Sequence, residues 1–188
     1  MLRRLRPEET VPGIATTRAG RRLLIVQPPG DLSPLYQRVI EDFSGAPGEK
    51  EVLRRTADDV TAVELAAQSV LILGDGLRSP AVQALLKQAR CPLSLTTGGF
   101  CFDGRVYEEP GHAVLCTVHH PDRPGCGITV YYGNSEIALG RADLLLHYRD
   151  SAVVFETTAR TVDNKTAYES RPVARRDFET PTVLEVQR

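Results

Sequence analysis

The chain has 188 residues, of which 41% are hydrophobic and 25% are charged, so it can bury one sizeable core and does not have a disordered composition. Lysine and arginine total 23 against 24 acidic residues, and the formal net charge of -1 gives no global attraction to nucleic acid or to an anionic membrane. No apolar run approaches the roughly 20 residues that cross a bilayer. We therefore expect a soluble domain with neither a nucleic-acid nor a membrane partner.

The first 21 residues are polar and rich in turn-forming residues, which predicts a flexible N-terminal segment. They lack the hydrophobic stretch of a signal peptide. Met1 is the single methionine, and we expect a module cut from a longer protein. The cellular location is unknown from these residues, and a secreted or periplasmic location stays open for such a module.

A strand-helix-strand-helix-strand unit is predicted next. Leu23–Val26 is a continuous apolar run typical of a strand buried in a parallel sheet. Ser33 is placed to cap a following helix, which Gly45 ends. A second strand near Val52 and a second helix lead to another buried strand at Val70–Leu73.

The third strand repeats the pattern of the first, because a glycine turn and a Ser-Pro helix start follow both. Ser33 and Ser79 hold equivalent places in the two loops. Right-handed crossovers make such strands parallel, so both helix starts are expected at the same carboxyl edge of the sheet.

The second half of the chain is richer in β-branched residues. Asp103-Gly104 is a strong turn signal within a β-hairpin predicted near Phe100–Glu108. A strand, a glycine turn, a helix over residues 135–146 and a last strand over residues 152–155 then restore the α/β alternation. The polar residues 157–188 are predicted to be mostly irregular.

These elements predict a single α/β domain over residues 22–156. We expect a three-layer, Rossmann- or flavodoxin-like arrangement with a mainly parallel sheet, a strand order of 2-1-3 at its start and an inserted β-hairpin.

Three glycine-containing loops each follow a predicted strand and precede a predicted helix. Loops of this kind expose backbone N–H groups at the positive end of a helix, so together they could receive an anion or another polar ligand. The alternative is that the glycines and serines serve only as turns and helix caps. The candidate ligand-binding residues are Gly30, Ser33, Gly74, Asp75, Gly76, Ser79, Gly133, Asn134 and Ser135.

The phosphate-binding motifs of nucleotide-binding proteins do not fit these loops. Leu73–Gly76 matches only the opening of a dinucleotide fingerprint, and the GxxxxGK[ST] motif is absent. Asp31 and Asp75 lie near the loop tips, where they would repel a phosphate. We therefore predict no cofactor.

His112, Cys116 and His120 share one face of a predicted strand and form a zinc-competent set of side chains. Residues four apart on a strand are about 13 Å apart, too far to share one ion without a bulge or a partner strand. We therefore predict no metal site there. The four cysteines show no CxxC spacing, and pairing of Cys91 or Cys126 in an oxidising compartment stays open.

The chain contains no GxSxG, HExxH or SxxK motif, so the common hydrolase signatures are absent. Ser135, Glu136 and His119 could form a triad only if the fold brought them together. A capped helix start explains Ser135 and Glu136 more simply. No catalytic residue is predicted, and no motif supports enzymatic activity.

The stretch from Gly98 to Glu156 resembles a Rossmann-like accessory segment of large bacterial hydrolases, including M1-type metallopeptidases. The resemblance covers the hairpin with Gly104 and Tyr107, the turn at residues 121–125, and the strand and loop ending in residues 133–135. It implies a noncatalytic module attached to a catalytic domain. The missing HExxH motif means that peptidase activity is not implied.

We therefore expect a noncatalytic accessory or ligand-recognition module of a larger bacterial protein. Its partner would be a catalytic domain in the same chain or further copies of itself. The alternatives are a stand-alone small-molecule binder or enzyme that uses the glycine loops to hold an anion, and a pure packing domain.

Overall fold

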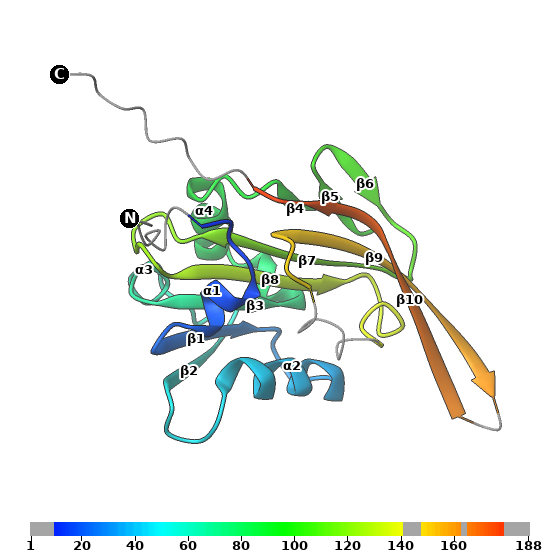
Figure 1. The fold of residues 1–188 in the computed structure, drawn as a ribbon, viewed down its shortest axis with the longest axis horizontal. Coiled ribbons are helices and arrows are strands. Elements are labelled where there is room, and N and C mark those ends of the chain that lie inside the picture. The colour runs from blue at the N-terminus through cyan, green and yellow to red at the C-terminus, as the bar shows by residue number, and fades with distance from the viewer. Residues whose placement is uncertain (1–9, 141–147, 163–164, 179–188) are drawn as a thin grey trace, which may run out of the picture.

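The structure is a computed structural model that describes residues 10–140, 148–162 and 165–178 (Figure 1). It contains a seven-stranded sheet in the order β10-β9-β7-β8-β3-β1-β2 and a three-stranded sheet in the order β4-β5-β6. In chain order the elements are α1 (Ile14–Arg18), β1 (Arg22–Gln27), α2 (Pro34–Ser44), β2 (Glu51–Thr56), α3 (Ala62–Ala66), β3 (Ser69–Leu73), the 3-10 helix η2 (Gly74–Arg78), α4 (Pro80–Gln88), β4 (Leu93–Leu95), β5 (Phe100–Phe102), β6 (Arg105–Tyr107), β7 (His112–His119), β8 (Gly127–Gly133), β9 (Ala152–Val162) and β10 (Lys165–Arg176).

One half of the large sheet is parallel. β1 pairs in parallel with β2 and with β3, and β3 pairs in parallel with β8. The predicted order 2-1-3 is confirmed. Residues Leu23–Val26 and Val70–Leu73 have no exposed surface, because helices or the small sheet cover both faces of these strands.

The other half of the sheet is antiparallel, so the prediction of a mainly parallel Rossmann- or flavodoxin-like fold was wrong. β7 runs antiparallel to both β8 and β9, and β9 runs antiparallel to β10. Residues 120–126 join β7 to β8, and a parallel crossover requires a connection of a dozen or more residues. The sheet is therefore mixed.

The inserted β-hairpin is confirmed, and it lies outside the large sheet. β5 and β6 pair around the turn at Asp103-Gly104, and β4 joins them to make the three-stranded sheet. Phe100, Phe102 and Tyr107 pack from this small sheet against the large one. The hairpin thus covers part of one face of the core.

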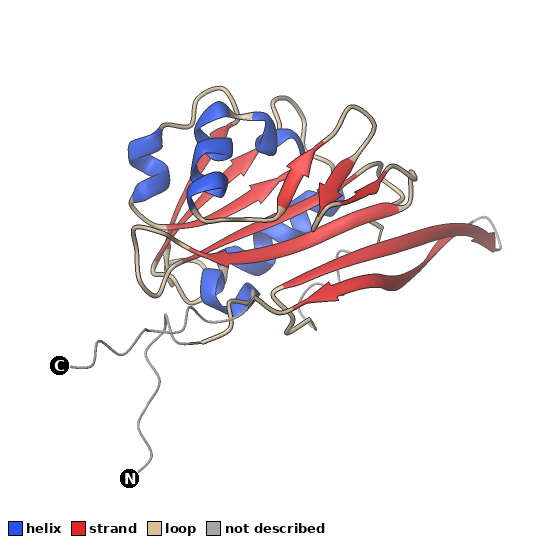
Figure 2. Ribbon diagram, turned by 90° about the horizontal axis from the view of Figure 1, so that it is seen from above, coloured by secondary structure: helices blue, strands red, loops and turns tan. Residues whose placement is uncertain are grey.

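The C-terminal segment was predicted to be irregular beyond residue 156, and this prediction was wrong for its described part. β9 continues to Val162, and β10 pairs with it along almost its whole length (Figures 1 and 2). The segment is polar on both faces, so it lacks the apolar alternation that marks a half-buried strand. Cross-strand hydrogen bonding forms the ribbon instead.

The prediction of a flexible N-terminal segment was also wrong for residues 14–18, which form α1. Ile14 packs in the core, and the Thr17 side chain is fully buried. The Thr17 hydroxyl lies 2.8 Å from the hydroxyl of Thr129 on β8. Two buried side chains thus hold a short polar helix on the sheet.

Two apolar clusters lie on opposite faces of the large sheet. α1 and α2 cover one face, where Ile25 and Phe43 are buried. α3, α4 and the small sheet cover the other face, where Leu24 and Leu86 are buried. Figure 2 shows helices on both sides of the strands.

The helix predicted over residues 135–146 is not seen in its described part. Residues 134–140 form bends and turns, including bonds from Leu139 N–H to the Glu136 carbonyl and from Gly140 N–H to the Ile137 carbonyl. Residues 141–147 lie outside the described part of the chain.

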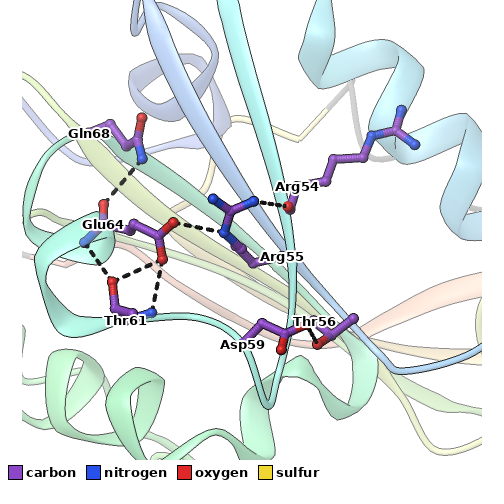
Figure 3. A network of polar contacts seen from close by, with 7 residues as sticks. All are labelled: Arg54, Arg55, Thr56, Asp59, Thr61, Glu64 and Gln68. Atoms are coloured by element: carbon purple, nitrogen blue, oxygen red, sulfur yellow. Dashed lines mark hydrogen bonds and ion pairs between the residues drawn. The ribbon is translucent and has the colours of Figure 1, made fainter.

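A polar network fixes the start of α3 beside β2 (Figure 3). The Thr61 hydroxyl accepts a bond from the Glu64 N–H, and the Glu64 carboxylate accepts bonds from the Thr61 N–H and hydroxyl. Arg55 of β2 donates to the same carboxylate at 2.7 Å. A capping box thus satisfies the first N–H groups of a five-residue helix and ties it to the sheet edge.

Replacing Gly111 with alanine tests the continuation of β9. A Cβ at this position would collide with the Thr157 carbonyl oxygen, and the Thr157 N–H donates to the Gly111 carbonyl at 2.8 Å. We expect Gly111→Ala to lower the free energy of unfolding by about 1–3 kcal/mol in urea titrations. Gly98→Ala is the control, because a Cβ there would have its nearest neighbours 3.8 Å away on the Glu108 side chain. Equal losses in both variants would contradict the prediction.

Glu64→Gln tests the network at α3 through its pH dependence. Hydrogen bonds from the Thr61 N–H and hydroxyl, aided by Arg55, lower the pKa of Glu64 in the folded protein. The charged carboxylate therefore stabilises the fold above its unfolded pKa of about 4.3, and this contribution is lost as the pH falls through the folded pKa. We expect the wild type to exceed Glu64→Gln in Tm near neutral pH and the gap to close in acid. A gap that is constant with pH would contradict this.

Candidate functional site

The three predicted loops meet at the carboxyl edge of the parallel strands. They surround a pocket of about 350 Å³ between the ends of β1, β3 and β8 and the start of α2. Five of the nine candidate residues are among those that line it. The lining residues are Pro28, Ser33, Tyr36, Gly74, Asp75, Arg78, Tyr132, Gly133, Asn134, Glu136 and Leu139. We call this pocket the edge crevice.

Two tyrosines contribute hydroxyl groups to the edge crevice. Burial, followed by the nearby Tyr132 and Asp75, raises the pKa of Tyr36 well above its usual value. Burial and Asp75 also raise the pKa of Tyr132, against the opposing effect of Arg78. Both hydroxyls therefore keep their protons at neutral pH and can donate hydrogen bonds to a ligand.

The Gly74 backbone lies directly against one of these hydroxyls. A Cβ on Gly74 would lie 2.7 Å from the Tyr36 hydroxyl oxygen, and the residue has a φ of +49°. Glycine is therefore required here both for its backbone conformation and for the close approach of the tyrosine.

Charged groups stand at the rim of the edge crevice. The Arg78 guanidinium donates to the Asp75 carboxylate at 2.8 Å, and both side chains are more than half exposed. Glu136 adds a second carboxylate. With two carboxylates and one guanidinium, the rim has a net charge of -1, and its guanidinium is already paired.

Asn134 presents an unused acceptor. Its side-chain N–H₂ donates to the carbonyl oxygens of Tyr107 and Glu109, at 3.0 and 2.9 Å. Its Oδ1 is buried and has no hydrogen-bond partner among the described residues. A buried acceptor without a partner is costly, so a ligand donor that reached it would add stability.

The remaining four candidates do not line the edge crevice. A Cβ added to Gly30 would have no other atom within 4 Å. A Cβ added to Gly76 would lie 2.7 Å from the Val26 carbonyl oxygen, so this position has no room for a side chain. Ser135 donates its hydroxyl to the Pro110 carbonyl at 2.6 Å. Ser79 begins α4, yet its buried hydroxyl makes no capping bond and has no partner among the described residues. These four residues lie outside the lining of the edge crevice.

Sequence reasoning missed the two tyrosines and Arg78, and it considered Glu136 only as a triad member. Each lies close in sequence to a residue that was found: Tyr36 follows the Ser33 cap by three positions, and Tyr132 precedes Gly133. Spacing along α2 could have found Tyr36, because position three of a helix faces the same side as its cap. The same spacing relates Arg78 to the candidate Asp75, with which it forms an ion pair.

The candidate metal ligands serve other contacts. His112 packs edge-on against Tyr107, with ring centroids 5.3 Å apart. His120 accepts a bond from the Asp122 N–H at Nδ1, so its Nε2 carries the proton and donates to the Leu65 carbonyl. Among the described residues, no group of three or more His, Cys, Asp or Glu side chains is placed to hold a metal ion.

Cys116 lies beside Cys91, with 3.7 Å between the two sulfur atoms. The hydrogen bond between the thiols lowers the pKa of Cys91, and it raises that of Cys116, which is buried. All four cysteines are free thiols, so the pairing left open for Cys91 or Cys126 is not formed.

The triad considered for Ser135, Glu136 and His119 is not assembled. His119 pairs with Gly127 at one end of the β7–β8 ladder, whereas Ser135 follows the other end. The His119 ring binds the Thr10 carbonyl at 2.7 Å. The antiparallel ladder therefore separates these side chains along the length of the strands.

No family model, curated protein or solved structure matches this chain. Within the described residues, no helix is both long and apolar enough to cross a membrane.

Ser79→Ala and Ser33→Ala separate the two serines that were both expected to cap helices. Ser33 accepts a bond from the Leu35 N–H, so we expect its loss to cost about 0.5–1 kcal/mol of unfolding free energy. Ser79 has a buried hydroxyl without a partner among the described residues, so alanine there should be neutral or stabilising. Chemical denaturation of both variants measures the difference, and a larger loss at Ser79 than at Ser33 would contradict this assignment.

Proposed function

We propose that this protein is a noncatalytic ligand-recognition module that binds a small polyhydroxylated molecule in the edge crevice. The observation that supports the proposal is the convergence of three strand-end loops on one pocket whose polar groups are not all used within the described residues. Its volume of about 350 Å³ is at the lower end of small-molecule pockets, which span roughly 300–1,000 Å³. A ligand the size of a monosaccharide fits this range.

The polar groups of the crevice favour hydroxyl groups on the ligand. The Tyr36 and Tyr132 hydroxyls can donate, while the two rim carboxylates can accept. A sugar or polyol hydroxyl can both donate and accept, so adjacent hydroxyls can satisfy this mixed set. The net negative rim disfavours a phosphate, although three loop ends of this kind often bind one.

An accessory role in a larger bacterial chain is the second part of the proposal. The resemblance of residues 98–156 to segments of large bacterial hydrolases supports it. A module of this kind supplies binding near a catalytic domain rather than chemistry of its own.

Thermal unfolding in the presence of monosaccharides, polyols, inorganic phosphate and nucleotides tests the binding proposal. A ligand at a hundredfold over its Kd adds about 2.7 kcal/mol of stability, which raises the Tm of a chain of this size by roughly 5–10 °C. We expect such a shift with a neutral polyhydroxylated compound and none with phosphate.

Tyr132→Phe tests whether the ligand binds in the edge crevice, because it removes one crevice hydroxyl and keeps the ring. We expect it to weaken binding by about tenfold, equivalent to about 1.4 kcal/mol for a lost hydrogen bond. Tyr148→Phe is the matched control, since Tyr148 packs against Phe155 and does not line the crevice. A flat panel, a shift with phosphate alone, or equal effects of the two variants would overturn the proposal.

A further inference from the structure

The outer part of β9 and β10 forms a two-stranded ribbon that leaves the body of the protein (Figures 1 and 2). β7 pairs with β9 only as far as Glu156, whereas β10 pairs with β9 to the end of the strand. Residues 158–161 and 165–167 are exposed. The ribbon is therefore held by one strand pair, without a third strand or a helix among the described residues.

Among the described residues, no further strand pairs with the outer edge of β10. β10 is the last strand of the sheet, so alternate backbone N–H and C=O groups point away from β9. A two-stranded ribbon alone is at best marginally stable in water, and pairing with further strands stabilises it. Pro172 lacks an N–H, and the register with β9 shifts between Pro172 and Ala174, so the accepting stretch lies before Pro172.

We propose that two copies of this chain associate through antiparallel pairing of their β10 strands, with Ala167 at the two-fold axis. A two-fold axis normal to the sheet places Lys165 of each copy directly opposite Glu169 of the other, on the same face. Two ion pairs then flank the axis. The stretch Lys165–Glu169 is complementary to itself.

Charge separates this register from the others near it. An axis at Lys165 would place two ammonium groups opposite each other, and an axis at Thr166 would place Lys165 opposite Ala167, without an ion pair. An axis at Tyr168 would place Lys165 opposite Arg171, and an axis at Glu169 would place two carboxylates opposite each other, so both oppose like charges. An axis at Ala167 opposes none among the described residues of the ribbon.

Two cross-strand ion pairs stabilise the ribbon within each copy, and Glu169 would share its carboxylate between Arg160 and Lys165 of the other copy. Arg171 binds Glu156 across the strands at 2.6 Å, and Arg160 lies 3.7 Å from Glu169. Antiparallel pairing at the outer half of β10 also places the two bodies at opposite ends of the shared ribbon. The copies therefore meet without contact between their cores.

Sedimentation or light scattering of the full chain over a concentration series tests the proposal. We expect a monomer–dimer equilibrium in the wild type. Lys165→Glu and Glu169→Lys should each be monomeric alone, because each opposes like charges across the axis. An equimolar mixture of the two should restore the dimer, since both pairs then become attractive. Arg54→Glu on the opposite sheet edge is the control and should dimerise like the wild type.

Disulfide crosslinking tests the register of the two β10 strands. Residues directly opposite each other in antiparallel strands have Cα atoms about 4.5–5.5 Å apart, which suits a disulfide. We expect Ala167→Cys to form a covalent dimer on mild oxidation, while Thr161→Cys on β9 and the wild type do not. A monomer at all concentrations, or a dimer unaffected by the charge reversals and the Ala167→Cys crosslink, would overturn the proposal.

Discussion

The burial of β3 and of residues Leu23–Val26 of β1 is the constraint on which the rest of the molecule depends. Strands with no exposed surface must be covered on both faces. Here α1 and α2 cover one face, and α3, α4 and the small sheet cover the other. Because β1, β3 and β8 run parallel to one another, the loops that follow them lie at one edge of the sheet. The edge crevice is thus a direct geometric result of core burial.

The antiparallel half of the sheet completes the crevice from the other direction. Asn134 follows β8, and its side chain donates to the carbonyl groups of Tyr107, at the end of β6, and of Glu109, in the connection from β6 to β7. Because β7 runs antiparallel to β8, the segment that joins β6 to β7 lies beside the end of β8. The edge crevice therefore combines the loops after the parallel strands β1, β3 and β8 with contacts from the segment that precedes the antiparallel strand β7.

The parallel block could be predicted from the sequence because its strands are continuous apolar runs and its loops begin with recognisable turn and cap residues. Strand direction beyond β3 could not, because β7 and β9 are also apolar, and apolarity does not distinguish a parallel neighbour from an antiparallel one. The ribbon was missed for the opposite reason, since its exposed residues have no apolar alternation. Within the crevice, glycine and serine positions were detectable, and the spacing of Tyr36 from Ser33 and of Arg78 from Asp75 was a local signal that was not used. Tyr132 joins the crevice through tertiary packing.

The ribbon also gives the sheet an uneven resistance to opening. Backbone hydrogen bonds near β3 open only when the core opens, whereas those of the ribbon can open locally at a small free-energy cost. Amide hydrogen exchange should therefore slow progressively from β10 toward β3. A second copy bound at β10 would slow exchange at the fast end of this gradient, and a ligand in the edge crevice would slow it near β3. Amide exchange would therefore distinguish the two binding events in one experiment.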